Sequence, residues 1–432
     1  MKKLQNYIFI LSISIFVGLA ALFIVYLLPT NPMEANVRSS IDIFYTESVY
    51  PQQVKGYKSS QLDNETDAIM LLDAIHPAQN RSALENALRV SRITFSNTTS
   101  SCIDLIQYAW ENKTPDQTVD YTRYWHGYLV WLKPLLLLMD YADLRMLNMM
   151  LQLLLLLTVI KYFLQKNLTR YLFPFAMSLI VLNPVSTAMS LQFSSIYYIV
   201  LLSMLIILKK HEYFYQKNLY PYLFFGLGII TVYFDFLTYP LAALCTPLIL
   251  VLILEYKISL PSWTSTVRQT LILGICFGLG YVSMWFGKWA ISSILLHENI
   301  IANAISEFTI HTGQTVIEGE AITKFGAIFR NLRVLFKWPY FIILGGYALY
   351  SLLKIDWRKA IHAFANIIPV LCVSLVPFAW IFVTSSHASW CYWYTYRGFI
   401  PSIFGFYVAL KMLPQKELRR SARCKYGFRN SF

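Results

Sequence analysis

YIFILSISIFVGLAALFIVYLL, residues 7–28, contains 22 residues and no charged side chain. A hydrocarbon core about 30 Å thick needs roughly 20 apolar residues in one helix, so this stretch is long enough to cross a bilayer. It is longer than the apolar core of a typical signal peptide, and the rest of the chain repeats its pattern. We therefore expect a retained first membrane span.

The composition extends this expectation to the whole chain. Of its 432 residues 56% are hydrophobic and 14% charged, with a mean hydropathy of +0.49, whereas a soluble domain has about 25% charged residues. This predicts an all-α polytopic integral membrane protein, a single membrane domain over residues 1–432 with about ten transmembrane helices. A window of about 19 residues places the later spans near residues 144–163, 171–190, 194–208, 220–234, 239–254, 270–291, 338–353, 367–384 and 398–412.

Lys and Arg gather in alternate segments between these spans. Because cytoplasmic segments carry the Lys and Arg excess, the N-terminus and the basic tail at residues 411–432 are both predicted to be cytoplasmic. The predicted cytoplasmic segments hold 20 of the 36 basic residues. The formal net charge of +13 is then mainly a consequence of topology, and nucleic-acid binding is not expected.

Two long loops fall on the opposite side, the first extracytoplasmic loop at residues 29–143 and the second at 292–337. The first holds 14 of the 23 carboxylates of the chain, so it is the first place to look for a site. Apolar residues at helical spacing predict short helices over 67–75 and 82–93. Residues 128–139 combine aromatic residues with a Leu run, which predicts a helix lying in the membrane interface.

The densest group of acids is LDNETD, residues 62–67, at the start of a predicted helix. In one interpretation Asp63 or Thr66 caps that helix and the other acids favour its positive end, worth on the order of 1 kcal/mol. In the other, a carboxylate of the cluster, Asp63 or Asp67, is the general base for an acceptor hydroxyl, and a neighbouring acid binds a divalent cation. The two interpretations are compatible, because a capping acid is also a positioned acid.

Ionisable residues also occur at the predicted outer ends of spans, where they are costly unless they line a cavity or a path. Asp235 is a short acid between two apolar spans, which favours a functional role. Lys288 and Arg397 would suit a phosphate at the headgroup level, and the alternative for each is snorkelling to the interface. If the spans pack as expected, these three side chains converge with the acid cluster in one outer vestibule.

Arg123, His126 and His387 lie near the same predicted vestibule and are further candidates for substrate binding. Either histidine can act as a base or a metal ligand, and the alternative is a structural hydrogen bond to the backbone. Cys102 and Cys391 are the cysteines on the predicted outer side, but their spacing does not support a disulfide.

Motifs of other chemistries are missing from the sequence. It has no CxxC pair and no HExxH, and its soluble segments contain no GxGxxG or Walker pattern, so neither a thiol redox motif nor a nucleotide-binding loop is indicated. No cofactor is required by what remains, while a divalent cation is compatible with the acid cluster.

Five stretches together carry a resemblance to a known group: LDNETDAIML (62–71), RYWHGYLVWLKPLL (123–136), FDFLTYPL (234–241), GYVSMWFGKW (280–289) and YWYTYRG (392–398). They resemble a group of uncharacterised bacterial polytopic membrane proteins, which in turn are similar to the GT-C superfamily of lipid-dependent glycosyltransferases. The resemblance runs over most of the chain as motif order and topology.

The resemblance implies a multi-pass protein of the bacterial cytoplasmic membrane that takes its sugar from a polyprenyl-phosphate donor. GT-C enzymes have an essential acid near the membrane in the first long outer loop, and Asp63 and Asp67 match that position, with Glu65 completing an ExD-like motif. The chain also departs from the pattern. The acid cluster lies about 35 residues after the first span, and the turn at residues 183–193 contains no acid, which leaves metal-free catalysis by one carboxylate as an equal alternative.

The resulting hypothesis is transfer of one sugar from polyprenyl phosphate to a cell-surface glycan or lipid acceptor. Asp67 or Asp63 deprotonates the acceptor, and Lys288 and Arg397 neutralise the departing phosphate. The alternatives are a transporter or flippase of a lipid-linked saccharide, a polysaccharide polymerase or ligase, and a non-catalytic scaffold. A transporter would be expected to show internal repeats and broken helices, and the sequence shows no convincing repeat.

Overall fold

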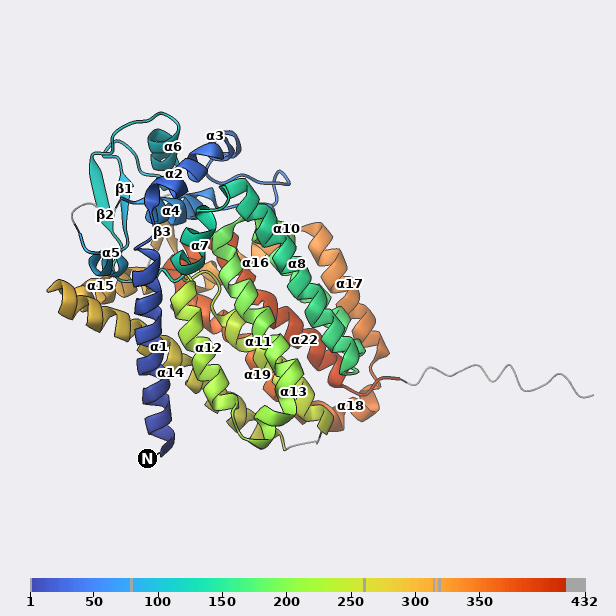
Figure 1. Cartoon of the computed structure of the whole chain (residues 1–432). Helices are drawn as coiled ribbons and strands as arrows, with labels where there is room; N and C mark the ends of the chain where they lie inside the picture. The colour runs from blue at the N-terminus through green and yellow to red at the C-terminus, as the bar shows by residue number, and fades with distance from the viewer. Residues whose placement is uncertain (1, 78–80, 259–261, 314, 318–319, 417–432) are drawn as a thin grey trace, which may run out of the picture.

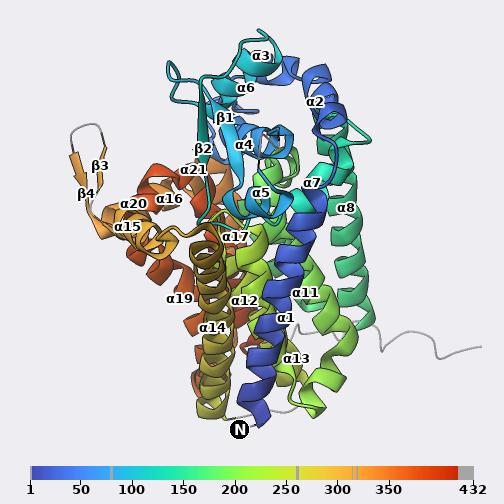
Figure 2. The same ribbon diagram turned by 60° about the vertical axis from the view of Figure 1, so that its left-hand side comes forward.

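Long helices packed side by side make up most of the protein, with a polar cap over one end (Figures 1 and 2). The computed structural model describes residues 2–77, 81–258, 262–313, 315–317 and 320–416, so most of the predicted basic tail lies outside the described residues. The helix bundle comprises α1 (Lys2–Val25), α8 (Tyr141–Gln165), α9 (Thr169–Leu182), α11 (Leu191–Gln216), α12 (Tyr220–Phe234), α13 (Leu241–Ile258), α14 (Trp263–Leu296), α17 (Trp338–Lys354), α19 (Ile368–Val383) and α22 (Ile400–Met412).

The membrane character expected from the composition is confirmed by these helices. Among the described residues, six helical segments are long and apolar enough to cross a bilayer: Lys3–Val25, Tyr141–Gln165, Leu191–Gln216, Leu241–Ile258, Trp263–Leu296 and Trp357–Val383. The last of them runs through the short α18 (Trp357–Ala363) and η2 (Phe364–Ile367) into α19. The fold is mostly helical, as predicted.

One predicted segment, 171–190, is divided into two helices. α9 ends at Leu182 and α10 (Pro184–Met189) begins after Asn183, whose φ of 48° is left-handed. Proline has no N–H to continue the preceding helix but fits the first turn of a new one. The Asn183 side chain then accepts a hydrogen bond from the Ser186 N–H at 3.3 Å and caps α10. This break places the start of α11 against the polar cap.

The polar cap, residues 29–140, contains α2 (Thr30–Ser39), α3 (Asp42–Glu47), η1 (Lys58–Ser60), α4 (Asn64–Ile75), α5 (Ala83–Arg89), β1 (Ser91–Thr94), α6 (Ser101–Ala109), β2 (Gln117–Asp120) and α7 (Leu129–Leu136). The helix predicted over 82–93 is shorter than expected. It ends at Arg89, and residues 91–94 pair antiparallel with β2, with Ser91 opposite Asp120. Alternating burial along β1 is the period of a strand rather than a helix.

Three short helices lie at the cap end of the bundle. α7 corresponds to the interfacial helix predicted over 128–139, while α15 (Ile300–Thr312) and α16 (Lys324–Leu335) come from the second long loop. α15 projects sideways from the end of α14 (Figure 2). Between α15 and α16 lies the hairpin β3 (Thr315–Ile317) and β4 (Glu320–Ile322), which was not predicted. The short α20 (Ser385–Trp390), α21 (Tyr392–Thr395) and η3 (Tyr396–Phe399) connect α19 to α22.

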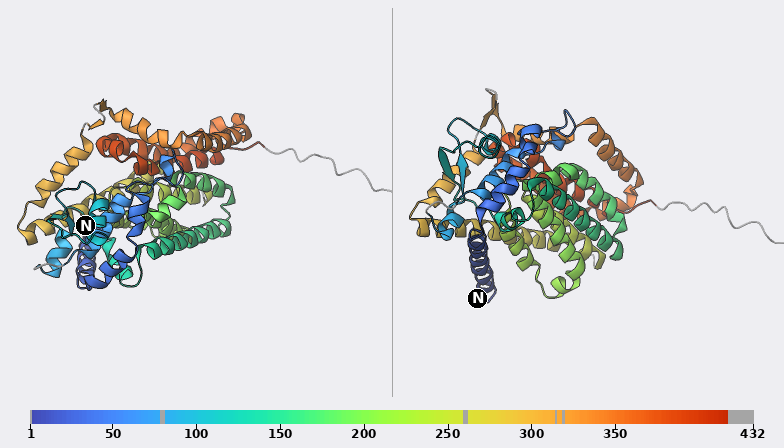
Figure 3. Two further views of the ribbon diagram at one scale, coloured as in Figure 1. Left: turned by 90° about the horizontal axis from the view of Figure 1, so that it is seen from above. Right: turned by 45° about the horizontal axis from the view of Figure 1, so that its top comes forward.

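Two glycines allow α12 and α14 to pack with their backbones in contact. A Cβ on Gly228 would lie 2.1 Å from the Phe277 carbonyl oxygen, and one on Gly280 would lie 2.1 Å from that of Phe225. Small residues at such crossings are typical of helix pairs in membranes. Seen from above, the blue and teal N-terminal part of the chain lies over one side of the bundle, with the orange and red C-terminal helices along the other side (Figure 3).

Candidate functional site

The three acids of the predicted cluster each lie at the N-terminus of a different helix. Asp63 caps its own helix α4, Glu65 caps α6, and Asp67 caps α11. Helix N-termini present unpaired N–H groups and the positive end of the helix dipole, so a carboxylate is stabilising there. Capping is therefore common to both interpretations of the cluster. The other contacts of each acid decide whether it can also act as a general base.

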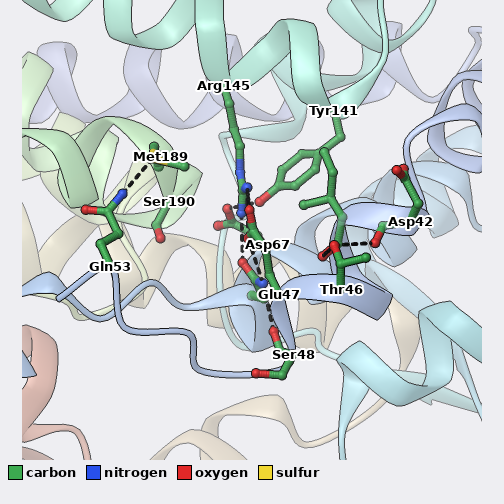
Figure 4. Close-up of polar contacts among 12 residues, drawn as sticks. Asp42, Thr46, Glu47, Ser48, Gln53, Asp67, Tyr141, Arg145, Met189 and Ser190 are labelled. Carbon is green, nitrogen blue, oxygen red and sulfur yellow. Dashed lines mark hydrogen bonds and ion pairs between the residues drawn. The ribbon is translucent and has the colours of Figure 1, made fainter. Parts of the chain in front are cut away.

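Asp67 is completely buried and fully hydrogen-bonded. Its carboxylate accepts from the Leu191 N–H at 2.9 Å, the Gln192 N–H at 3.2 Å and the Tyr141 hydroxyl at 2.6 Å. Arg145 lies close by and pairs with Glu47 at 2.8 Å (Figure 4). Burial raises the pKa of Asp67 to about 6, against the opposing effects of these hydrogen bonds and of Arg145. This arrangement joins the cap to α11 and leaves little room for an acceptor hydroxyl.

Glu65 has a similar structural role at α6. Its carboxylate accepts from the Ser101 N–H at 2.6 Å, the Cys102 N–H at 3.2 Å and the Ser100 hydroxyl. These are the first N–H groups of the helix, which would otherwise be unpaired. Within the described part of the chain, no group of three or more His, Cys, Asp or Glu side chains is arranged to hold a metal ion.

Asp63 is also buried, with 1% of the residue exposed, and lies near Trp393 of the segment that connects α19 to α22. One carboxylate oxygen accepts from the Thr66 N–H at 3.0 Å and the other from the Gln192 side-chain amide. Burial raises its pKa to about 7, and Asp67 adds to that shift, while the Trp393 indole favours the charged form. Tyr50, 40% exposed, packs edge-on against Trp393 with ring centroids 5.1 Å apart. An acid with a pKa near 7 beside a partly exposed aromatic pair is suited to general base catalysis.

The two predicted phosphate ligands, Lys288 and Arg397, are buried against helix C-termini. Lys288 Nζ donates to the Leu88 carbonyl at 2.8 Å, at the end of α5. Arg397 donates to the Leu182 carbonyl at 3.1 Å, at the end of α9, and to the Ser186 hydroxyl at 3.0 Å. Both side chains are 0% exposed. A cation there complements the negative end of a helix dipole, so these contacts position the cap and the break between α9 and α10.

Asp235 shapes the turn that follows α12. Its carboxylate accepts from the Thr238 N–H at 3.0 Å and from the Thr238 hydroxyl, and Leu237 has a left-handed φ of 62°. His387 Nε2 lies 3.0 Å from the Leu237 carbonyl oxygen. The centroid of the His387 ring is also 6.0 Å from that of the Tyr394 ring. The negative charge of Asp63 contributes to the raised pKa of the Tyr394 hydroxyl. The turns after α12 and α19 therefore connect Asp235 to the neighbourhood of Asp63.

His126 belongs to a buried cluster with Asp73, an acid that sequence reasoning missed. The Tyr128 hydroxyl donates to Asp73 at 2.6 Å and lies 3.0 Å from His126 Nδ1. Burial lowers the pKa of His126 well below its usual value and raises that of Asp73 to about 7. His126 Nε2 donates a structural hydrogen bond to the Tyr121 carbonyl at 3.0 Å, so this side chain holds the segment 121–128 together. An acid within the apolar run AIMLLDAI, residues 68–75, was the available signal for Asp73.

Arg123 is the predicted binding residue that lines a cavity. This cavity has a volume of about 350 Å³ and lies beneath α15, between the cap-side ends of α14 and α19. Its walls are mostly aromatic and aliphatic, and Glu307 of α15 lies opposite Arg123, with Arg123 Nη2 3.6 Å from Glu307 Oε2. Arg123 Nε and Trp285 Nε1 are buried without a hydrogen-bond partner. The cavity therefore combines an apolar interior with polar groups at the level of the cap.

The predicted single vestibule is not formed by the five charged residues expected to line it. The walls of the cavity at Arg123 come from Arg123, Tyr124, Leu237, Tyr281, Val282, Trp285, Trp289, Ala304, Glu307, Phe308, Thr312, Trp380 and Thr384. Asp63, Asp67, Asp235, Lys288 and Arg397 are not among these residues. Cys102 and Cys391 are free thiols.

Comparison with known proteins found no matching family model, no similar curated protein and no similar solved structure. The function is accordingly argued from the residues and the geometry of the site.

Proposed function

We propose that this protein is a membrane glycosyltransferase that moves a sugar from a polyprenyl-phosphate donor to a cell-surface glycan or lipid acceptor. The observation that supports it best is the cavity at Arg123, which we call the donor cavity, an apolar volume between membrane helices with Arg123 in its wall. Most ligand cavities are apolar with a few placed polar groups. A lipid chain with an anionic phosphate at one end has the matching distribution of polarity.

In this proposal the hydrocarbon chain lies along the wall formed by α14 and α19, and the phosphate contacts Arg123. A guanidinium can hold two phosphate oxygens at once. Arg123 and Trp285 both line this cavity, and the Arg123 Nε is buried without a hydrogen-bond partner, which is costly for a donor. When the guanidinium turns into the cavity, a phosphate supplies the missing acceptor and Glu307 gives up Arg123 to the substrate.

Asp63 is the proposed general base. Its carboxylate takes the proton of the acceptor hydroxyl while the oxygen attacks the anomeric carbon of the sugar. The bond from that carbon to the phosphate oxygen breaks, and the phosphate leaves with the electron pair as an anion stabilised by Arg123. Asp67 and Glu65 fit this role less well, because each accepts from two backbone N–H groups of another helix. Asp63 accepts from one backbone N–H, that of Thr66 in its own helix.

The membrane arrangement that goes with this function is the predicted one. About ten spans would place both termini in the cytoplasm of a bacterium and the polar cap, with Asp63, on the outer side of its cytoplasmic membrane. Each of the ten predicted segments overlaps a bundle helix, and six of the described helical segments are long and apolar enough to span a bilayer, which supports a multi-pass arrangement. A polyprenyl-linked sugar presented at the outer leaflet would then reach the donor cavity sideways from the bilayer.

Replacement of Arg123 by Gln is expected to lower kcat/KM for the polyprenyl-phosphate sugar about 10- to 100-fold, because one charge-assisted contact to phosphate is worth about 1.5–3 kcal/mol. The measurement is transfer of radiolabelled sugar by purified protein with a membrane extract as acceptor. Arg81→Gln is the matched control, since Arg81 is similarly exposed but pairs with Asp120 away from the cavity.

The same assay decides between the proposed enzyme and its main rival. If no donor is turned over while labelled lipid crosses the bilayer of reconstituted vesicles, the protein is a transporter or flippase. Equal kinetics of the wild-type, Arg123→Gln and Arg81→Gln proteins would rule out Arg123 as the phosphate ligand.

A further inference from the structure

A second cavity lies on the other side of α19. This acceptor groove, as we name it, has a volume of about 520 Å³ and is bounded by α16, α17, α19 and α22. Its lining residues are Leu332, Leu335, Phe336, Phe341, Leu344, Gly345, Ala348, Leu371, Ser374, Leu375, Phe378, Phe399, Ser402, Ile403, Phe406 and Tyr407. None of these side chains is charged, so the groove suits hydrocarbon.

The groove and the donor cavity share α19, and both lie beside the segment that connects α19 to α22. Phe378 of α19 lines the groove, whereas Trp380 and Thr384, just beyond it, line the donor cavity. The segment 384–399 then runs from the donor cavity past Trp393 to Phe399, which lines the groove. The two cavities therefore flank the turn that carries the aromatic neighbour of Asp63.

Hydrogen bonds hold α16, which forms part of the groove wall, against this turn. Its Asn331 side chain donates to the Ala388 carbonyl at 2.8 Å and accepts from the Thr395 hydroxyl at 2.7 Å. Leu332 and Leu335 of the same helix face the groove. A molecule held beneath α16 would thus have its polar end beside α20 and α21, near the Tyr50 and Trp393 pair.

Resting on the proposed function, we infer that the acceptor is membrane-anchored and that one of its hydrocarbon chains occupies the acceptor groove. A soluble glycan would need no apolar cavity of this size on the second side of α19. Two chains on either side of α19 would bring a donor phosphate and an acceptor headgroup to the same turn.

Two adjacent glycines of α17 provide a matched test. Gly345 lines the groove and Gly346 does not, and a Cβ added to either would meet no atom within 4 Å. Gly345→Trp should fill the groove without displacing the fold, while Gly346→Trp should add the same side chain to the lipid-facing side. Because both changes replace glycine within one helix turn, their effects on helix stability are similar.

The first measurement is occupancy. Each full-length protein is reconstituted in phosphatidylglycerol nanodiscs with a trace of a phospholipid that carries a diazirine on its acyl chain, and cross-linked peptides are quantified against a reference peptide of α1. Cross-linking of peptides from α17 and α22 should fall at least five-fold in Gly345→Trp and stay unchanged in Gly346→Trp. Equal cross-linking in all three proteins would overturn occupancy of the groove.

The second measurement is transfer to the lipid fraction of a membrane extract and, separately, to its delipidated glycan fraction. We expect Gly345→Trp to lose at least 10-fold in transfer to lipid, with KM for the donor unchanged and Gly346→Trp active. Unchanged transfer, or transfer to the glycan fraction alone, would overturn the acceptor assignment. Absence of turnover in wild type would overturn the proposed function and the acceptor assignment with it, while the cross-linking result would still decide whether a chain occupies the groove.

Discussion

An Asp67→Ala variant is expected to lose about 4 kcal/mol of unfolding free energy. The change would leave the Leu191 N–H, the Gln192 N–H and the Tyr141 hydroxyl without their acceptor. An unpaired buried polar group costs about 1–3 kcal/mol, and removing one partner of a buried charge commonly costs about 3–5 kcal/mol. The upper part of α11 and the polar cap should therefore separate first.

Thermal unfolding of purified protein, followed by circular dichroism and by proteolysis of the cap, measures this effect. The control is Asp116→Ala in the same cap, because Asp116 is exposed and bonds only Ser96 among the described residues. The control should keep the wild-type unfolding midpoint. A wild-type midpoint in Asp67→Ala would show that the contact between α4 and α11 is not needed for stability.

Asp63→Asn is expected to lower the transfer rate about 10²- to 10⁴-fold, the usual contribution of a general base, while the protein stays folded. Asparagine can still cap α4 through Thr66, and rotation of the Gln192 amide restores its hydrogen bond. The wild-type rate should rise with pH through about 7, where Asp63 ionises. The variant should show no such rise.

The stability of Asp63→Asn provides an independent check on its role. The pKa of Asp63 is raised from 3.8 to about 7 in the folded protein, so its favourable contribution is fully present below pH 3.8 and is lost as the pH rises through 7. Above pH 8 the variant should therefore be at least as stable as wild type. Full activity in Asp63→Asn would exclude this acid as the base, and loss of activity together with stability would make it structural.

Helices were predictable because their signal is local. The segment 220–234 coincides with α12, and the first span overlaps α1 over most of its length. β1 and β2 were missed because a four-residue strand depends on a partner some 25 residues away. The span predicted over 171–190 extended beyond the break at Asn183 because the apolar residues continue across it, although the turn predicted over 183–193 begins there and Pro184 is its signal.

The site was less predictable than the fold for a physical reason. A buried Lys or Asp in the sequence does not reveal whether it faces a ligand or the end of another helix. Lys288 and Arg397 found carbonyl groups at helix C-termini, and Asp67 found the N-terminus of a helix 124 residues away. Arg123 differs from these residues because its Nε donates no hydrogen bond to a helix end. Only the three-dimensional arrangement shows this difference.

The helix-end contacts also determine when the cap can be completed during synthesis. Asp67 requires Leu191, and the carbonyl of Leu88 requires Lys288, which is 200 residues later in the chain. Closing such long loops delays folding. During synthesis the first carboxylates would leave the ribosome well before the helices whose N–H groups bind them. The cap would therefore stay open and hydrated until α11 and then α14 have entered the membrane.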